Sequence, residues 1–121
     1  MRQYFRAELV YLLCFICAPS LASEAHIENV VTNKSANGKV SFTVTLRHAD
    51  KSWDHYANFW QVETLQGVVL AKRVLHHPHI NEQPFTRSLS SIVIPEGVRQ
   101  VIVTAGCTLD GKHSNDYLVD L

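Results

Sequence analysis

Apolar and polar residues alternate along most of this chain, and that alternation limits its fold more than any other feature. The apolar residues at every second position between 39 and 48 are Val40, Phe42, Val44 and Leu46. A repeat of two residues is typical of a β-strand with one buried face, whereas an amphipathic helix repeats about every 3.6 residues. Asn-Gly at 37–38 is a strong signal for a tight turn just before this segment. Residues 39–48 are therefore predicted to form a strand.

The same reading predicts seven strands, at residues 27–32, 39–48, 58–65, 68–74, 85–94, 98–106 and 116–121. Residues that favour turns, such as Gly67, Pro78 and Pro95, lie between them. No stretch after residue 25 shows a helical period. These features predict an all-β fold, a seven-stranded antiparallel β-sandwich of the immunoglobulin or fibronectin type III kind, with Trp60 between the sheets. A small β-barrel is the alternative.

The first 25 residues have the order of a secretory signal peptide. Arg2 and Arg6 precede an apolar run over residues 9–18, and small residues follow it. This run is shorter than the roughly 20 residues of a membrane-spanning helix. Residues 1–25 are therefore predicted to be cleaved, leaving residues 26–121 as one periplasmic or secreted domain with no stable membrane insertion. Cleavage after Ala22 or after Ala25 fits the small-x-small rule, and the second cut would make His26 the first residue.

Cysteine content indicates how the domain is stabilised, and net charge indicates which partners it would attract. Cys14 and Cys17 lie in the predicted signal peptide, and no lipobox precedes either, so we expect no lipid anchor. Cys107 is then the only thiol of the domain, which must be stabilised by its core and not by an internal disulfide. The formal net charge of the chain is zero. No long-range field would attract nucleic acid or anionic lipid, so neither is expected as a partner.

The histidines are predicted to gather at one end of the domain. Consecutive antiparallel strands alternate in direction, so the loops at 49–57, 75–84 and 107–115 fall at the end where the first strand begins. The histidines placed at that end are His26, His48, His55, His76, His77, His79 and His113. The same end also collects Asp54, Glu82, Cys107 and Asp110. Imidazole with a carboxylate or a thiolate suits copper or zinc and suits calcium or magnesium poorly.

The segment His-His-Pro-His at 76–79 is the most concentrated part of this set. Pro78 keeps the backbone extended, so His77 and His79 should face the same way and could bind one metal ion, with Glu82 as a further ligand. The other interpretation is a solvated loop whose apolar neighbours do the packing, because a histidine cluster without a spaced motif is compositional evidence only.

The segment Trp-Asp-His-Tyr-Ala at 53–57 is the second unusual loop. His55 could join the metal site, with Asp54 as the partner of a liganding imidazole. Trp53 and Tyr56 could form a platform for a protein or glycan partner, or they could cover the open end of the core.

Two single residues complete the candidates for a metal site. If cleavage follows Ala25, the amine and imidazole of His26 could chelate one copper ion. The other interpretation is that His26 is simply the start of a disordered terminus. Cys107 shares its parity with Val101 and Val103 and is interpreted as a small buried hydrophobe, with a catalytic thiol as the weaker alternative.

Three motifs resemble a group of small exported bacterial proteins of unassigned function. They are Trp-Asp-His-Tyr-Ala at 53–57, His-Pro-His-x-x-Glu-Gln-Pro-Phe-Thr-Arg-Ser at 77–88 and Ile-Pro-Glu-Gly-Val at 94–98. The resemblance covers most of residues 26–121 and supplies no activity. The sixth strand of that group ends in an Ala-His-Asp-x-x-His-Gly-like stretch, where residues 105–111 here read Ala-Gly-Cys-Thr-Leu-Asp-Gly. If those histidines are metal ligands in the group, this chain has lost or replaced them.

The sequence lacks the motifs of common enzymes. There is no Gly-x-Ser-x-Gly elbow, no phosphate-binding loop and no His-Glu-x-x-His segment. We therefore expect a non-enzymatic exported binding domain with a copper or zinc site formed by His77, His79, His55, His26 and Glu82. The alternative is a metal-free module that binds a protein or glycan through Trp53 and Tyr56.

Overall fold

The computed structural model describes residues 24–121 as strands, turns and loops. The predicted signal peptide falls almost entirely on residues 1–23, outside the described part of the chain. In chain order the strands are β1 (His26–Lys34), β2 (Val40–Arg47), β3 (Ala57–Thr64), β4 (Val69–Val74), β5 (Phe85–Ile92), β6 (Gln100–Cys107), β7 (Gly111–Lys112) and β8 (Tyr117–Asp120). Over residues 24–121 there is no helix of any kind, and hence none long and apolar enough to cross a membrane.

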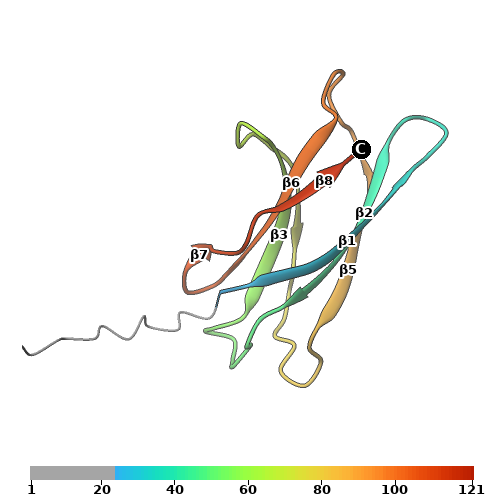
Figure 1. Cartoon of the computed structure of the whole chain (residues 1–121). Helices are drawn as coiled ribbons and strands as arrows, with labels where there is room; N and C mark the ends of the chain where they lie inside the picture. Colours follow the sequence, from blue (N-terminus) through green and yellow to red (C-terminus); the bar gives the residue numbers. More distant parts are fainter. Residues whose placement is uncertain (1–23) are drawn as a thin grey trace, which may run out of the picture.

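The strands form two antiparallel sheets, as Figure 1 shows. One sheet has the order β1-β2-β5. The other has the order β4-β3-β6-β7, and β8 also pairs with β6. The all-β class and the antiparallel pairing predicted from the period of two are therefore confirmed.

The prediction of seven strands was wrong by one. Seven of the eight strands match the predicted ranges to within two residues at each end. The extra strand, β7, has only two residues, which is too short for an alternation pattern to reveal. It forms because Gly111 has a positive φ of 64°, so the chain reverses tightly and Lys112 pairs with Gly106.

The two sheets share one hydrophobic core. The inward residues of β2 are Val40, Phe42, Val44 and Leu46, and all are buried. They pack in one cluster with residues of the opposite sheet, namely Trp60, Val62, Val101, Val103 and Ala105. Trp60 has no exposed surface, in agreement with the predicted aromatic centre of the core.

The loops divide between the two ends of the sheets as the strand alternation predicts. Loops 35–39, 65–68 and 93–99 lie at the upper end in Figure 1, and loops 48–56 and 75–84 lie at the lower end. The turn after β6 joins the lower group, because the Thr108 N–H donates to the Tyr56 carbonyl at 3.0 Å and the Thr108 hydroxyl donates to the Asp54 carbonyl at 2.9 Å. This lower end is where the candidate ligands meet.

Candidate metal centre

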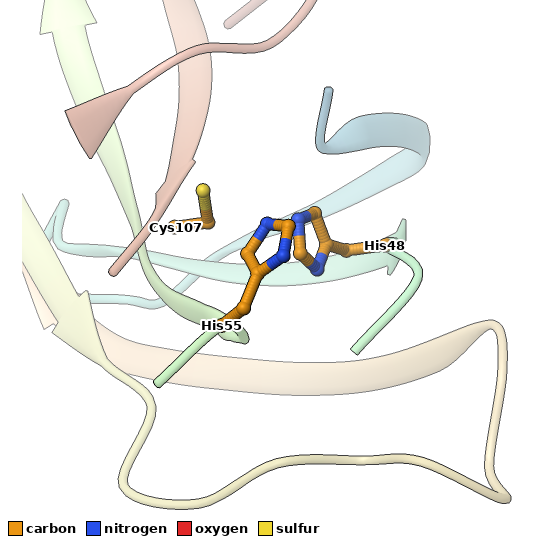
Figure 2. A group of neighbouring side chains, drawn as sticks. All are labelled: His48, His55 and Cys107. Atoms are coloured by element: carbon orange, nitrogen blue, oxygen red, sulfur yellow. The ribbon is translucent and has the colours of Figure 1, made fainter. Parts of the chain in front are cut away.

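Three side chains of residue types that can bind a metal ion converge at the lower end, from three separate segments. His48 follows β2, His55 lies in loop 48–56, and Cys107 ends β6. Each contributes one ligand atom to a group in which all three atoms lie within 4.8 Å of one another, and Figure 2 shows the three side chains together. In the part of the chain that the structure describes, no other group of three or more His, Cys, Asp or Glu residues meets this condition.

His48 and Cys107 reach this point because each continues the buried face of its strand. His48 is two residues after Leu46, and it keeps only 1% of its surface exposed. Cys107 is two residues after Ala105 and is 2% exposed. The faces of two opposed sheets thus bring an imidazole and a thiol to the same edge of the core.

A buried carboxylate fixes the orientation of the His48 ring. His48 Nδ1 lies 2.6 Å from Oδ1 of Asp50, and both side chains are fully buried. A carboxylate only accepts hydrogen bonds, so Nδ1 carries a proton, and in the neutral form of such a ring the lone pair is on Nε2. That Nε2 is buried and has no hydrogen-bond partner among residues 24–121. In many metal sites a carboxylate accepts a hydrogen bond from one nitrogen of a histidine whose other nitrogen binds the ion, and this pair has the same arrangement.

Asp50 remains ionised through its hydrogen bonds. Burial acts to raise its pKa, but hydrogen bonds from the His48 ring, the His79 N–H and the Ala57 N–H outweigh burial and lower the pKa below its ordinary value. The Ala57 N–H donates to Oδ1 at 2.9 Å and the His79 N–H donates to Oδ2 at 2.7 Å. Asp50 thus joins the end of β2, the start of β3 and loop 75–84.

His55 and Cys107 complete the cluster. The rings of His48 and His55 meet edge to face, with centroids 5.1 Å apart. The Cys107 thiol donates to the Asp110 carboxylate at 3.6 Å, and its sulfur accepts the Asp110 N–H at 3.4 Å. Both contacts hold the sulfur of Cys107 in a defined position beside the turn after β6.

Gly106 allows the turn after β6 to approach the sheet. A Cβ at this position would overlap the carbonyl oxygen of Gly111 and lie 2.5 Å from the Phe59 ring. The described backbone therefore leaves no room for a side chain larger than glycine at this position. Cys107, one residue later, is buried at the same edge.

The structure divides the predicted ligands into two groups. His55 lies in the three-residue cluster. His77, His79, His26 and Glu82 lie outside it. His48 and Cys107 were predicted to lie at this end of the domain but were not among the predicted ligands.

His77 and His79 do face each other, with ring centroids 4.5 Å apart. His79 is nevertheless engaged elsewhere: its ring stacks on Phe85 at 4.0 Å, and Arg87 Nη2 donates to its Nε2 at 2.8 Å. Burial lowers the pKa of His79, and the charges of Arg87 and His77 lower it further. Glu82 forms an ion pair with Arg87 at 3.9 Å. A metal ion on Nε2 of His79 would have to replace the hydrogen bond from Arg87.

The start of the described chain bears on the two cleavage sites. Ala25 is completely buried and belongs to the core, and its N–H donates to the His113 carbonyl at 3.1 Å. The side chain of His26, at the start of β1, is exposed. Cleavage after Ala25 would remove a core residue, whereas cleavage after Ala22 would keep it. These contacts favour the Ala22 site, which would leave His26 without a terminal amine.

The two aromatic residues of loop 48–56 differ in exposure. Trp53 is 67% exposed, and its ring meets the half-buried Tyr56 edge to face at a centroid distance of 5.9 Å. Tyr56 is thus partly covered, whereas most of the Trp53 ring faces solvent.

The comparisons with known proteins give a relative but no activity. The chain is 40% identical over 97 residues to a protein of Halomicrobium mukohataei named "Putative lipoprotein". The match covers 80% of this chain and 47% of the relative, so the chain spans about half the length of the curated relative it matches. No family model matches the chain, and no solved structure matches it significantly.

Proposed function

We propose that this chain is an exported, non-enzymatic domain that binds a copper or zinc ion through His48, His55 and Cys107. Two observations about His48 carry the proposal. Its buried Nε2 has no hydrogen-bond partner in the described chain. The residue also lies in a cluster with a second imidazole and a thiol. Leaving a buried acceptor unpaired costs about 1–3 kcal/mol. A metal ion would use this lone pair and remove that cost.

The spacing of the three ligand atoms supports a metal ion of this size. Zinc bonds to nitrogen and sulfur of about 2.0–2.3 Å in a tetrahedral site place the ligand atoms about 3.3–3.7 Å apart. The present separations of up to 4.8 Å would need to contract by only about 1 Å. Rotation of the thiol and imidazole side chains can supply that movement without a change in the sheets.

The ligand types support copper or zinc over other ions. Thiolate and imidazole together suit these two metals, whereas calcium and magnesium require oxygen ligands. The ion would displace the thiol proton of Cys107, so affinity should rise with pH as that proton is lost. Asp50 would accept a hydrogen bond from His48 and so keep the proton on Nδ1.

Export to the periplasm or beyond is supported by two independent observations. The N-terminal residues have the composition of a signal peptide, and the relative from Halomicrobium mukohataei carries a lipoprotein name. A copper or zinc ion held by a small exported domain would serve binding, delivery or storage.

The strand order supports a fibronectin type III-like sandwich over a constant-type immunoglobulin domain. In the constant-type domain the fourth strand lies on the sheet of the first, second and fifth strands. Here β4 pairs with β3 on the other sheet. An experimental structure with β4 beside β5 would contradict this assignment.

Titration of the mature protein with zinc and with copper(I), under reducing conditions, tests the proposed site. One equivalent of metal should bind, and binding should be lost or weakened strongly in Cys107→Ser and in His55→Ala. His77→Ala is the matched control, because it removes an exposed imidazole that lies outside the cluster. If His77→Ala abolishes binding and His55→Ala does not, the site is in loop 75–84 and the proposal is wrong.

A metal-free interaction module is the second candidate, favoured by the exposure of Trp53. A large aromatic ring with two thirds of its surface in solvent suits a protein or glycan partner. Under this alternative Trp53→Ala would abolish partner capture without affecting folding, and chelators would have no effect.

A further inference from the structure

Loop 75–84 forms hydrogen bonds with His48 of the candidate cluster and with its neighbour Asp50. Its contacts are made mainly by Gln83, whose Oε1 accepts the His48 N–H at 3.0 Å and whose Nε2 donates to the His79 carbonyl at 2.8 Å. One side chain therefore ties the backbone of a proposed ligand to the backbone of the loop. Gln83 is half-buried, so solvent competes only partly for these two hydrogen bonds.

His79 is held on three sides by its own contacts. Its ring is nearly parallel to that of Phe85, with an interplanar angle of 11°, and Arg87 donates to its Nε2. Its backbone N–H donates to Oδ2 of Asp50 at 2.7 Å. Together with the Gln83 bond to its carbonyl, these contacts fix the position of the N–H that Asp50 accepts.

We propose that Gln83 and His79 are positioning residues of the metal site, acting through Asp50 to fix the tautomer and direction of the His48 ring. This inference rests on the proposed function of the cluster and goes further, because it assigns a role to the His-Pro-His-x-x-Glu-Gln motif. The motif supports the ligand set from outside and contributes no ligand. The chain of contacts runs from Gln83 and His79 to Asp50, and from Asp50 to Nδ1 of His48.

Loss of Gln83 should weaken metal binding while leaving all three ligands in place. In Gln83→Ala the His48 N–H and the His79 carbonyl lose their shared partner, so loop 75–84 can move away from the end of β2. Asp50 then accepts a less fixed N–H, and the His48 ring can adopt the other tautomer. Removing outer contacts of metal ligands typically costs 10- to 100-fold in affinity, and for this more distant contact we expect about 10-fold.

The chain offers a matched control at the other end of the molecule. Gln100 donates from Nε2 to the Asp120 carboxylate at 2.7 Å, at the end of β6 opposite Cys107. Gln100→Ala removes the same chemical group and one hydrogen bond far from the cluster. Gln100→Ala reports the effect of losing a glutamine side chain away from the cluster, whereas a positioning role acts only in Gln83→Ala.

Two measurements on the mature domain test the inference. The first is zinc affinity by competition with a chromophoric chelator. The second is the tautomer of His48 in the metal-free protein, read from long-range nitrogen–proton NMR correlations of the imidazole. In Gln83→Ala we expect about 10-fold weaker zinc binding. We also expect the His48 ring to change from the Nδ1–H tautomer to a mixture of both tautomers. Gln100→Ala should show neither change. Equal affinity and an unchanged tautomer in the two variants would overturn the positioning role.

The NMR measurement separates this inference from the proposed function. If the wild-type protein binds neither zinc nor copper, the proposed function fails, and the His48 tautomer alone decides the positioning role. If Gln83→Ala does not fold, His79→Phe replaces it, because phenylalanine retains a ring to stack on Phe85 and removes the hydrogen bond from Arg87. A His48 tautomer unchanged in His79→Phe would overturn the role assigned to His79.

Discussion

Replacing Asp50 by asparagine tests the hydrogen-bond network next to the candidate metal cluster with the smallest change in shape. The carboxylate accepts three hydrogen bonds, from the His48 ring at 2.6 Å, the His79 N–H at 2.7 Å and the Ala57 N–H at 2.9 Å. An asparagine side chain has only one acceptor oxygen. If that oxygen faces the His48 ring and Ala57, the amide NH2 group faces the His79 N–H, and two donors oppose each other.

The cost can be worked out from this geometry. A hydrogen bond to a charged group contributes about 1.5–3 kcal/mol, and a buried donor left unpaired costs about 1–3 kcal/mol. Because these two terms describe partly the same loss, we expect Asp50→Asn to lower the free energy of unfolding by about 2–4 kcal/mol. With a urea m-value of about 1.5 kcal/mol/M, the midpoint should fall by about 2 M.

The pH dependence of stability gives a second signature. The folded-state pKa of Asp50 is lowered, so the unfolded chain binds its proton more readily than the folded chain does. The stabilisation is therefore fully present above the ordinary pKa of about 3.9 and is lost as pH falls through the lower folded value. In that acidic range the difference in the free energy of unfolding between the wild-type protein and Asp50→Asn should disappear.

The assay is urea unfolding followed by tryptophan fluorescence, at pH 7 and at a series of pH values descending through the acidic range. Asp54→Asn is the matched control, because Asp54 is exposed and lies in the same loop. A loss below 0.5 kcal/mol in Asp50→Asn at pH 7, or a difference from wild type that persists unchanged in acid, would refute the network.

Three further perturbations give distinct expected results. His79→Phe should remove a loss of stability below about pH 6.5 in the wild-type protein, since burial and Arg87 lower the folded pKa of His79; equal pH profiles would contradict this. Trp53→Ala should change the free energy of unfolding by about 1 kcal/mol or less in thermal or urea melts, because the ring is mostly exposed. Gly106→Ala should cost about 1–3 kcal/mol by chemical denaturation, because its Cβ overlaps the Gly111 carbonyl and the Phe59 ring; a neutral effect would show that the β6–β7 turn adapts freely.

Periodicity predicted the strands well because burial on one face is a local property. Along β2 every second side chain enters the core, and the pattern continues through His48 beyond the end of the strand. The two-residue strand β7 could not be predicted this way, because its pairing depends on a positive φ at Gly111 and on the close approach that Gly106 permits.

The sequence predicted the end of the domain at which the candidate site lies, but it did not predict which residues form the cluster. The alternation of strand direction put the histidines at one end, and the structure brings His48, His55 and Cys107 together there. The inward parity of His48 and Cys107 was the available signal, since both continue rows of buried residues on opposed sheets. The density of histidines at 76–79 directed attention to the loop instead. The arrangement of Asp50, Gln83 and Arg87 around that loop depends on contacts between distant segments, which no local pattern reports.

X-ray absorption spectroscopy of the zinc-loaded mature domain tests the central claim most directly, because it identifies the atoms bound to the ion. Binding through His48, His55 and Cys107 should give one sulfur at about 2.3 Å and at least two imidazole nitrogens at about 2.0–2.1 Å, with the sulfur absent in Cys107→Ser. A first shell of nitrogen and oxygen alone in the wild-type protein would contradict it.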